Sequence, residues 1–294
     1  MLSGVMLLWF LLTALSVIFV AWDIQSTPES PVLKAGFVLL TCYTGPLGAF
    51  LYILGCREPL PGLHERYVAI RWRQALGSTM HCVAGDGVGI LAGAVISAWI
   101  HIPRPGGLIL EYVLGFAFGW TIFQALFMRD MAGGSYSRAL RSTFLPELLS
   151  MNFLMAGMTP VMTLAMKVTP GSHNPLGPAF WFVMSMALLT GFVVAYPMNW
   201  WLVANHLKHG MMTVRKQNQT DHHQLAYARG MDHHAAMPDS GSTLNTPKSS
   251  DDHKSSKHSA PLPSARVQRA MSLLSFFVFG LGIGIVWIFG GFSG

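Results

Sequence analysis

Three side chains near the start of a long apolar segment could carry chemistry: His81, Cys82 and Asp86. They lie within residues 79–86, which read Thr-Met-His-Cys-Val-Ala-Gly-Asp, and the apolar segment continues to Ile100. Ionisable groups in a membrane helix are costly, and they usually face a bundle interior, a cavity or a partner. Imidazole and thiolate ligate soft metal ions, while a carboxylate can orient such ligands or take up protons. These residues are therefore the first candidates for a functional site.

The same helix carries a ridge of small residues beside the ionisable groups. At 100° per residue, His81, Cys82 and Asp86 share an arc of about 140° with three glycines, which are Gly85, Gly89 and Gly93. Small residues at this spacing let a second helix approach closely. The ionisable groups are thus expected to face a packed neighbour rather than lipid. A purely structural pair that joins two helices explains them equally well, and glycine faces of this kind also predict a homo-oligomer.

A stripe of methionines follows a glutamate further along the chain. Glu147 stands near the start of the apolar segment 144–166, and five methionines recur after it at spacings of three and four: Met151, Met155, Met158, Met162 and Met166. This spacing places them on one helix face. Thioethers suit Cu(I), so the stripe could pass a soft cation. Methionine also fills irregular membrane cores and needs no ligand to be there.

The next apolar segment ends in Asn199, His206 and His209, which share one side if the helix continues beyond Trp201. Two histidines three residues apart can bind one metal ion. The third and fifth apolar segments begin on the side of the membrane where the sixth ends, so all these groups are expected near one membrane face. Glu111 and Gln124, at opposite ends of the fourth segment, are predicted outliers.

Residues 202–270 form the one long polar insertion, and residues 216–268 within it are expected to be disordered because they contain almost nothing to bury. The loop is rich in imidazoles and thioethers that could collect copper: His222, His223, Met231, His233, His234 and Met237. The pattern Met-Asp-His-x-x-x-Met resembles repeats of bacterial copper-resistance proteins. A solvated linker with incidental histidines is the alternative.

The composition predicts an all-α, polytopic membrane bundle. Only 11% of the 294 residues are charged and 52% are hydrophobic, whereas about a quarter are charged in soluble domains. Seven segments approach the length of about 20 residues that a bilayer requires: 2–22, 35–55, 77–100, 108–128, 144–166, 178–201 and 271–292. Three cysteines provide no disulfide framework. The formal charge of +6 is explained by topology rather than by a nucleic-acid partner.

Basic residues predict the orientation. Arginines gather in residues 57–74 and 129–141, while the connections on the other side hold few basic residues. The positive-inside rule then places the N-terminus inside and the C-terminus outside, and we expect the chain in the inner cell membrane. Four regions follow: residues 1–70 with two spans and a basic interfacial segment, 71–215 with a four-helix core, 216–268 with the His/Met-rich loop, and 269–294 with the last span.

Two motifs carry a resemblance to a known family. Met80-His-Cys-Val-Ala-Gly-Asp-Gly-Val-Gly-Ile90 and Pro197-Met-Asn-Trp-Trp-Leu-Val203, followed by Lys208-His-Gly-Met211, resemble the signature of an uncharacterised bacterial membrane family, domain of unknown function 4396. The similarity covers residues 71–215. Members are sometimes labelled copper oxidases, but this sequence contains no cupredoxin ligand motif. The resemblance implies a multi-pass fold and a connection with copper, without a mechanism.

The main functional hypothesis is a membrane protein that binds or transports a soft metal ion, copper being the expected ion. Its proposed ligands are His81, Cys82, His206 and His209, supported by Asp86, Glu147 and Asn199. The alternatives are a redox subunit with haem between His81 and His206, and a scaffold without chemistry. No enzymatic activity is assigned. Cys82 cannot form an activated pair with His81, because adjacent helix residues diverge by about 100°.

Overall fold

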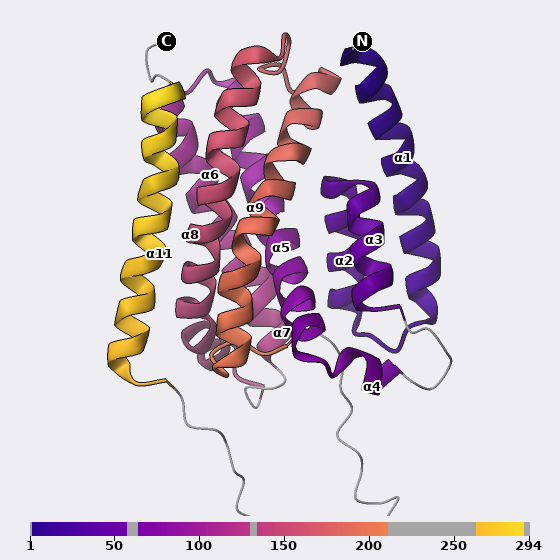
Figure 1. The fold of residues 1–294 in the computed structure, drawn as a ribbon, viewed down its shortest axis with the longest axis vertical. Helices are drawn as coiled ribbons and strands as arrows, with labels where there is room; N and C mark the ends of the chain where they lie inside the picture. The colour runs from indigo at the N-terminus through magenta and orange to yellow at the C-terminus, as the bar shows by residue number, and fades with distance from the viewer. Residues whose placement is uncertain (1, 58–63, 130–133, 211–262, 291–294) are drawn as a thin grey trace, which may run out of the picture. The chain divides into compact units, whose positions relative to one another are not determined.

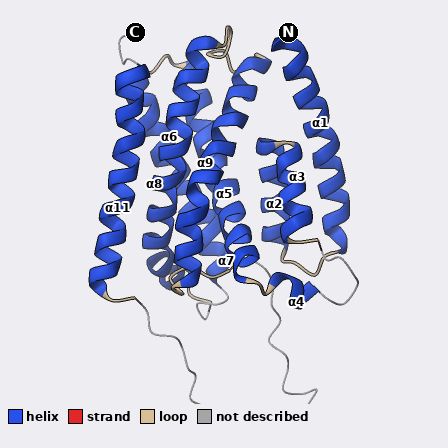
Figure 2. Ribbon diagram, viewed as in Figure 1, coloured by secondary structure: helices blue, strands red, loops and turns tan. Residues whose placement is uncertain are grey.

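The computed structural model describes residues 2–57, 64–129, 134–210 and 263–290. The chain divides into two compact units, residues 1–214 with 262–294 and residues 215–261. The second unit, with its predicted collector residues, lies outside the described residues. Within the described ranges every regular element is a helix, as Figure 2 shows. The predicted all-α, polytopic class is therefore confirmed.

Six helices of the described residues are long and apolar enough to cross a bilayer. They are α1 (Leu2–Asp23) with η1 (Ile24–Ser26), α5 (Arg71–Trp99), α6 (Arg104–Phe118) with η2 (Gly119–Gln124) and α7 (Ala125–Arg129), α8 (Tyr136–Val168), α9 (Pro178–Ala204), and α11 (Ala265–Ile285) with η3 (Val286–Gly290). In Figure 1, α5, α6, α8 and α9 form the centre of the bundle, and α11 covers one side of it.

The predicted span over residues 35–55 is wrong as a single helix. The structure has two short helices there, α2 (Pro31–Thr44) and α3 (Pro46–Gly55). Gly45 separates them with a φ of 60°, and Pro46 begins the second helix. At 1.5 Å per residue these helices measure about 21 and 15 Å, whereas the hydrocarbon core is about 30 Å thick. Figure 1 shows them side by side as a hairpin next to α1.

The hairpin changes the predicted topology. Seven crossings would place the two ends of the chain on opposite sides of the membrane. Figure 1 shows the start of α1 and the end of the helix that begins with α11 at the same end of the bundle, while α4 (His64–Val68) lies at the other end, next to the start of α5. The prediction that the two ends of the chain lie on opposite sides of the membrane required a crossing at residues 35–55, and the structure has no spanning helix there.

The glycine ridge of α5 packs against α6, as its spacing predicted. A Cβ atom added to Gly89 would collide with the carbonyl oxygen of Leu114, and one added to Gly93 would lie 2.9 Å from Cα of Glu111. One added to Gly85 would lie 2.7 Å from the ring of Phe123. The two backbones are thus in direct contact, which only glycine permits here. Because α6 of the same chain covers the ridge, this face of α5 is not free to pair with a second copy.

Candidate functional site

A buried cluster of acidic groups joins α5 to α8. Cys82 and Asp86 are one turn apart on α5, and Glu147 faces them from α8. The three offer one thiol sulfur and two carboxylate oxygens that all lie within 4.8 Å of one another. The Cys82 thiol donates to Glu147, with Sγ 3.0 Å from Oε1 and 2.9 Å from Oε2. All three side chains are shielded from solvent. We call Cys82, Asp86 and Glu147 the acidic cluster.

A buried lysine supplies the positive charge at this cluster. Lys208 Nζ donates to Cys82 Sγ at 2.9 Å, to Glu147 Oε2 at 3.2 Å and to Asn199 Oδ1 at 3.0 Å. Lys208 follows the end of α9, where the chain turns back through His206 at a φ of 57°. Burial disfavours the ammonium ion, but the interactions of Lys208 with Cys82 and Glu147 outweigh burial and raise the pKa of Lys208. Nζ thus has three acceptors, the number of hydrogen bonds that an ammonium group can donate.

Neutral polar groups hold this arrangement in place. Asn199 donates through Nδ2 to Ser150 Oγ at 2.7 Å, while its Oδ1 accepts from Lys208. The amide of Asn199 is thus oriented by a partner on each side. Ser150 Oγ also lies 3.3 Å from Cys82 Sγ, and Gln124 Nε2 donates to the same sulfur at 3.7 Å. We call the acidic cluster together with Lys208, Asn199, Ser150 and Gln124 the polar network, and Cys82 is its centre.

Asp86 is the member of the acidic cluster whose carboxylate oxygens lack hydrogen-bond partners. It has no exposed surface, and neither of its carboxylate oxygens has a hydrogen-bond partner among the described residues. An isolated carboxylate in such a place is expensive unless it is protonated or meets a cation. Next to it, a Cβ atom on Gly119 would collide with Oδ1 of Asp86 and would lie 3.1 Å from Oε1 of Glu147. The Asp86 carboxylate thus occupies the place that a side chain at position 119 would need, so glycine there allows both carboxylates to pack against η2.

The wall opposite α5 is a π-helix, η2 (Gly119–Gln124). Single turns of π-helix inside α-helices occur frequently at functional sites. Here the turn brings Gly119 against Asp86 and Gln124 onto Cys82. The prediction that Gln124 is an outlier is therefore wrong, because the π-turn shifts the register of the helix and carries this residue to the cluster.

His81 does not join the acidic cluster. Its ring lies between those of Phe123 and Phe127, with centroid distances of 5.4 and 5.2 Å. The side chain is fully buried, and neither ring nitrogen has a hydrogen-bond partner among the described residues. The step of about 100° between adjacent helix residues places the imidazole on a different face from the Cys82 thiol. The structure thus separates two residues that the sequence places together.

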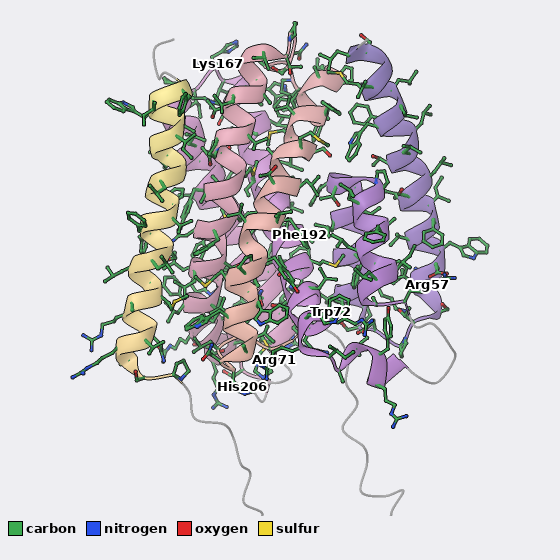
Figure 3. All side chains as sticks on the ribbon, viewed as in Figure 1. Arg57, Arg71, Trp72, Lys167, Phe192 and His206 are labelled. Atoms are coloured by element: carbon green, nitrogen blue, oxygen red, sulfur yellow. The ribbon has the colours of Figure 1, made fainter. Side chains whose placement is uncertain are left out.

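His206 and His209 lie outside the cluster as well, at a cavity of about 250 Å³. This cavity, which we call the His206 cavity, is lined also by Arg71, Gln74 and Lys208. Figure 3 shows Arg71 and His206 close to the same end of the bundle. Burial and the neighbouring His206 lower the pKa of His209. Lys208 belongs to both the cavity and the polar network, so its side chain separates the acidic cluster from this opening.

The methionine stripe of α8 is buried along its whole length. Met151, Met155, Met158 and Met162 are at most 1% exposed, and Met166 is 5% exposed. They form part of the main hydrophobic core. The stripe begins one turn after Glu147, so it continues the face of α8 that carries the acidic cluster.

The cluster lies deeper than the sequence suggested. Helices α5 and α8 begin at Arg71 and Tyr136, six and eight residues before the predicted spans. Cys82 and Glu147 each stand eleven residues beyond these starts, a rise of about 16 Å. The site is therefore inside the bundle rather than at its mouth.

Fold and site together define a polytopic helical membrane protein with a buried Cys/Asp/Glu cluster that could hold a metal ion. Residues 71–208, just under half of the chain, match the family described as Domain of unknown function (DUF4396), which is the family that the two motifs resemble. The matched region begins with α5 and ends at Lys208, and it contains every residue of the polar network. Searches of curated proteins and of solved structures find no significant match.

Proposed function

We propose that the acidic cluster binds a soft or borderline metal ion, and that the protein binds and transports copper in the membrane. The observation that carries this proposal is the convergence of Cys82, Asp86 and Glu147 within 4.8 Å in a buried place, with one ammonium group beside them. Three ionised acids and one Lys208 leave two negative charges. A divalent ion neutralises them, as does a monovalent ion together with one proton.

The donor types narrow the choice of ion. A thiolate is a soft ligand and carboxylates are hard ligands, and this mixture suits borderline ions such as Zn²⁺ or Cu²⁺. The adjoining methionine stripe offers only thioethers, which favour Cu(I) and do not favour zinc. We assign Cu(I) to both features, because the Cys82 thiolate and the thioethers of the stripe are ligands that it prefers, so no change of oxidation state is required. Zinc is the comparison in the test.

In this proposal the Lys208 ammonium group interacts with the ligands of the acidic cluster when no metal ion is bound there. Its ammonium group already bonds two of the three proposed ligands, at 2.9 Å from Cys82 Sγ and 3.2 Å from Glu147 Oε2. A metal ion that enters from the His206 cavity exchanges with this ammonium group, which then moves toward the cavity it also lines. His206 and His209 contribute at the entrance, and Asn199 positions Lys208.

The test is metal binding by the purified full-length chain in detergent. Cu(I) affinity is measured by competition with a chelator, and Zn²⁺ is titrated in parallel. We expect Cys82→Ser, Asp86→Asn and Glu147→Gln each to weaken Cu(I) binding by at least about tenfold. Cys42→Ser is the matched control, because Cys42 is an exposed thiol outside the cluster. Equal affinity in the wild type and the cluster variants overturns the proposal, and a preference for zinc assigns a different ion.

The same sample tests the two alternatives. Haem bound through His81 and His206 predicts a Soret band that is lost in His81→Ala. A scaffold without chemistry predicts that the cluster variants change thermal stability but bind metal as the wild type does. No enzymatic step is assigned to the cluster.

For the membrane, we propose that the arginine-rich end of the bundle faces the cytoplasm, in the inner membrane of a bacterial cell. Figure 3 shows Arg57 and Arg71 near this end, and Arg73 lies in the first turn of α5 after Arg71. The positive-inside rule assigns such residues to the cytoplasmic side. Because both termini lie at the other end, they face outward in this arrangement. The His206 cavity then opens to the cytoplasm.

A further inference from the structure

A second cavity lies at the end of the bundle opposite Lys208. Its volume is about 520 Å³, and its walls come from the end of α5, the start of α6, the end of α8 and the chain around the start of α9. Figure 3 shows Lys167, the neighbour of the lining residue Met166, at the end opposite Arg71 and His206. The polar lining residues are Ser97, His101, Arg104, Glu111 and His173. We call this opening the Glu111 cavity.

Two buried polar atoms of this cavity have no hydrogen-bond partner among the described residues: Glu111 Oε2 and Ser97 Oγ. Glu111 is only 2% exposed. Buried polar groups in native proteins are nearly always hydrogen-bonded, and an unpaired carboxylate in an apolar place is especially costly. Arg104 does not satisfy Glu111, because no ion pair between the two is found in the described ranges. A ligand that donates hydrogen bonds to both atoms removes this cost.

Arg104 brings the opposite charge to the same cavity. Its guanidinium donates to Thr163 Oγ1 at 3.1 Å and to Met166 Sδ at 3.6 Å. A guanidinium has five N–H donors, so these two bonds fix it against α8 and leave donors for a ligand. Arg104 is also the first residue of α6, and no side chain caps that end of the helix. Both the guanidinium and the positive end of the helix dipole favour a carboxylate.

The two charged side chains line one cavity at different depths. Arg104 and Glu111 are two turns apart on α6, which puts them on one face of the helix and about 10 Å apart along its axis. A purely cationic ligand would meet the like charge of Arg104, and a purely anionic ligand would meet that of Glu111. A ligand that carries both an ammonium group and a carboxylate finds an opposite charge for each.

The remaining lining suits an apolar side chain on such a ligand. Ala94, Met166 and Phe180 line the cavity and are at most 5% exposed. His101 and His173 are exposed, so the cavity opens to the outside of the bundle on their side. Sites for small molecules combine apolar walls with a few placed polar groups in this way, at volumes of about 300–1,000 Å³.

We infer that the Glu111 cavity binds a small zwitterion, an α-amino acid with an apolar side chain. Glu111 and Ser97 accept hydrogen bonds from its ammonium group, and Arg104 binds its carboxylate. Phe180 and Met166 pack against its side chain. The inference goes beyond the proposed function, because this site needs no metal ion and uses no residue of the polar network.

The test is amino-acid binding by the purified full-length chain in detergent, with copper and zinc removed by chelators. Equilibrium dialysis measures the binding of radiolabelled L-leucine and L-methionine. Two unlabelled competitors divide leucine into its parts: isoamylamine lacks the carboxylate, and 4-methylpentanoate lacks the ammonium group. We expect saturable binding of the amino acids, and competition by each analogue that is weaker than that by leucine by at least about tenfold.

Two variants assign the ends of the ligand. Glu111→Gln should weaken leucine binding at least about tenfold and remove the advantage of leucine over 4-methylpentanoate, because the ammonium group loses its charged partner. Arg104→Gln should likewise remove the advantage of leucine over isoamylamine. A merely structural role would weaken all three ligands alike, which would overturn the assigned contacts. Glu29→Gln, which removes a buried carboxylate elsewhere, is the control and should bind leucine as the wild type does.

The wild-type protein alone is sufficient to overturn the inference, even if the two variants do not fold. No saturable binding of either amino acid would do so, as would equal competition by leucine and one of its analogues. Leucine binding that is unchanged in both variants would also contradict the site. Because the assay contains no metal ion, its outcome is independent of copper binding at the acidic cluster, and failure of either proposal leaves the other standing.

Discussion

Lys208 Nζ lies 2.9 Å from Cys82 Sγ, although 126 residues separate the two in the sequence. The contact places an ammonium group where a metal ion bound to the cluster would meet its sulfur ligand. It also joins the two ends of the family-matched region, because Lys208 is its last residue and Cys82 lies in its first helix, α5. The first prediction concerns this lysine.

Replacing Lys208 with Met is expected to lower stability and to raise metal affinity. The ion pair with Glu147 is buried on both sides, and removing one partner of such a pair costs about 3–5 kcal/mol. The same change removes the ammonium group that competes with the ion, so Cu(I) affinity should rise at least about tenfold, or about 1.4 kcal/mol. The thermal unfolding midpoint in detergent and chelator competition measure the two effects.

Lys167→Met is the control for this variant, because Lys167 is an exposed lysine at the other end of α8. It should change neither quantity. A Lys208→Met protein that binds copper more weakly than the wild type would show that the lysine supports the site instead of competing for it.

Gly119→Ala is expected to disturb the site without changing any polar group. The added methyl would collide with Oδ1 of Asp86 and crowd Oε1 of Glu147. Overpacking of this kind costs about 1–3 kcal/mol, and the displaced carboxylates should bind metal more weakly. Gly280→Ala in α11 is the control, since nothing lies within 4 Å of a Cβ atom there. Unfolding midpoints and copper affinities of the two variants decide the matter, and identical behaviour would contradict the close approach of Gly119.

Helical periodicity and the alternation of spans account for much of this site. Cys82 and Asp86 follow from the four-residue spacing, and counting crossings brings Glu147 and Asn199 to the same level of the bundle. The structure then places these four side chains in one polar network. Lys208 escapes such reasoning, because it lies beyond the end of α9 and returns to the site only through a turn whose geometry no periodicity describes.

Two further features could not be predicted from the hydrophobic pattern of the sequence, for different physical reasons. Gln124 reaches Cys82 through a π-turn, and hydrophobic patterning assumes a constant 100° per residue. The helix ends at Gly45 and a new one begins at Pro46, but the residues on both sides are apolar over a length that could span the bilayer. Hydropathy alone therefore predicts one continuous helix there. A glycine followed by a proline is the local signal that could have revealed the hairpin.

The hairpin predicts that both ends of the chain are accessible from the same side of the membrane. Ser3→Cys and Lys167→Cys should react with a membrane-impermeant maleimide from one side, and Ser264→Cys and His206→Cys from the other. The positions lie at the ends of α1, α8, α11 and α9. The experiment compares intact cells with opened cells, with the wild-type chain as the background for its own cysteines. Labelling of Ser3→Cys and Lys167→Cys from opposite sides would restore the seven-span topology.

The methionine stripe yields a prediction that separates a transport path from ordinary packing. Met158→Leu keeps the volume of a fully buried side chain and should cost less than about 1.5 kcal/mol. Because it removes only a thioether outside the acidic cluster, copper binding at the cluster should persist while copper uptake by proteoliposomes falls. Met184→Leu is matched in burial but lies on α9 rather than in the α8 stripe, and should leave uptake unchanged. If both variants transport copper as the wild type does, the stripe is core packing and not a path for the ion.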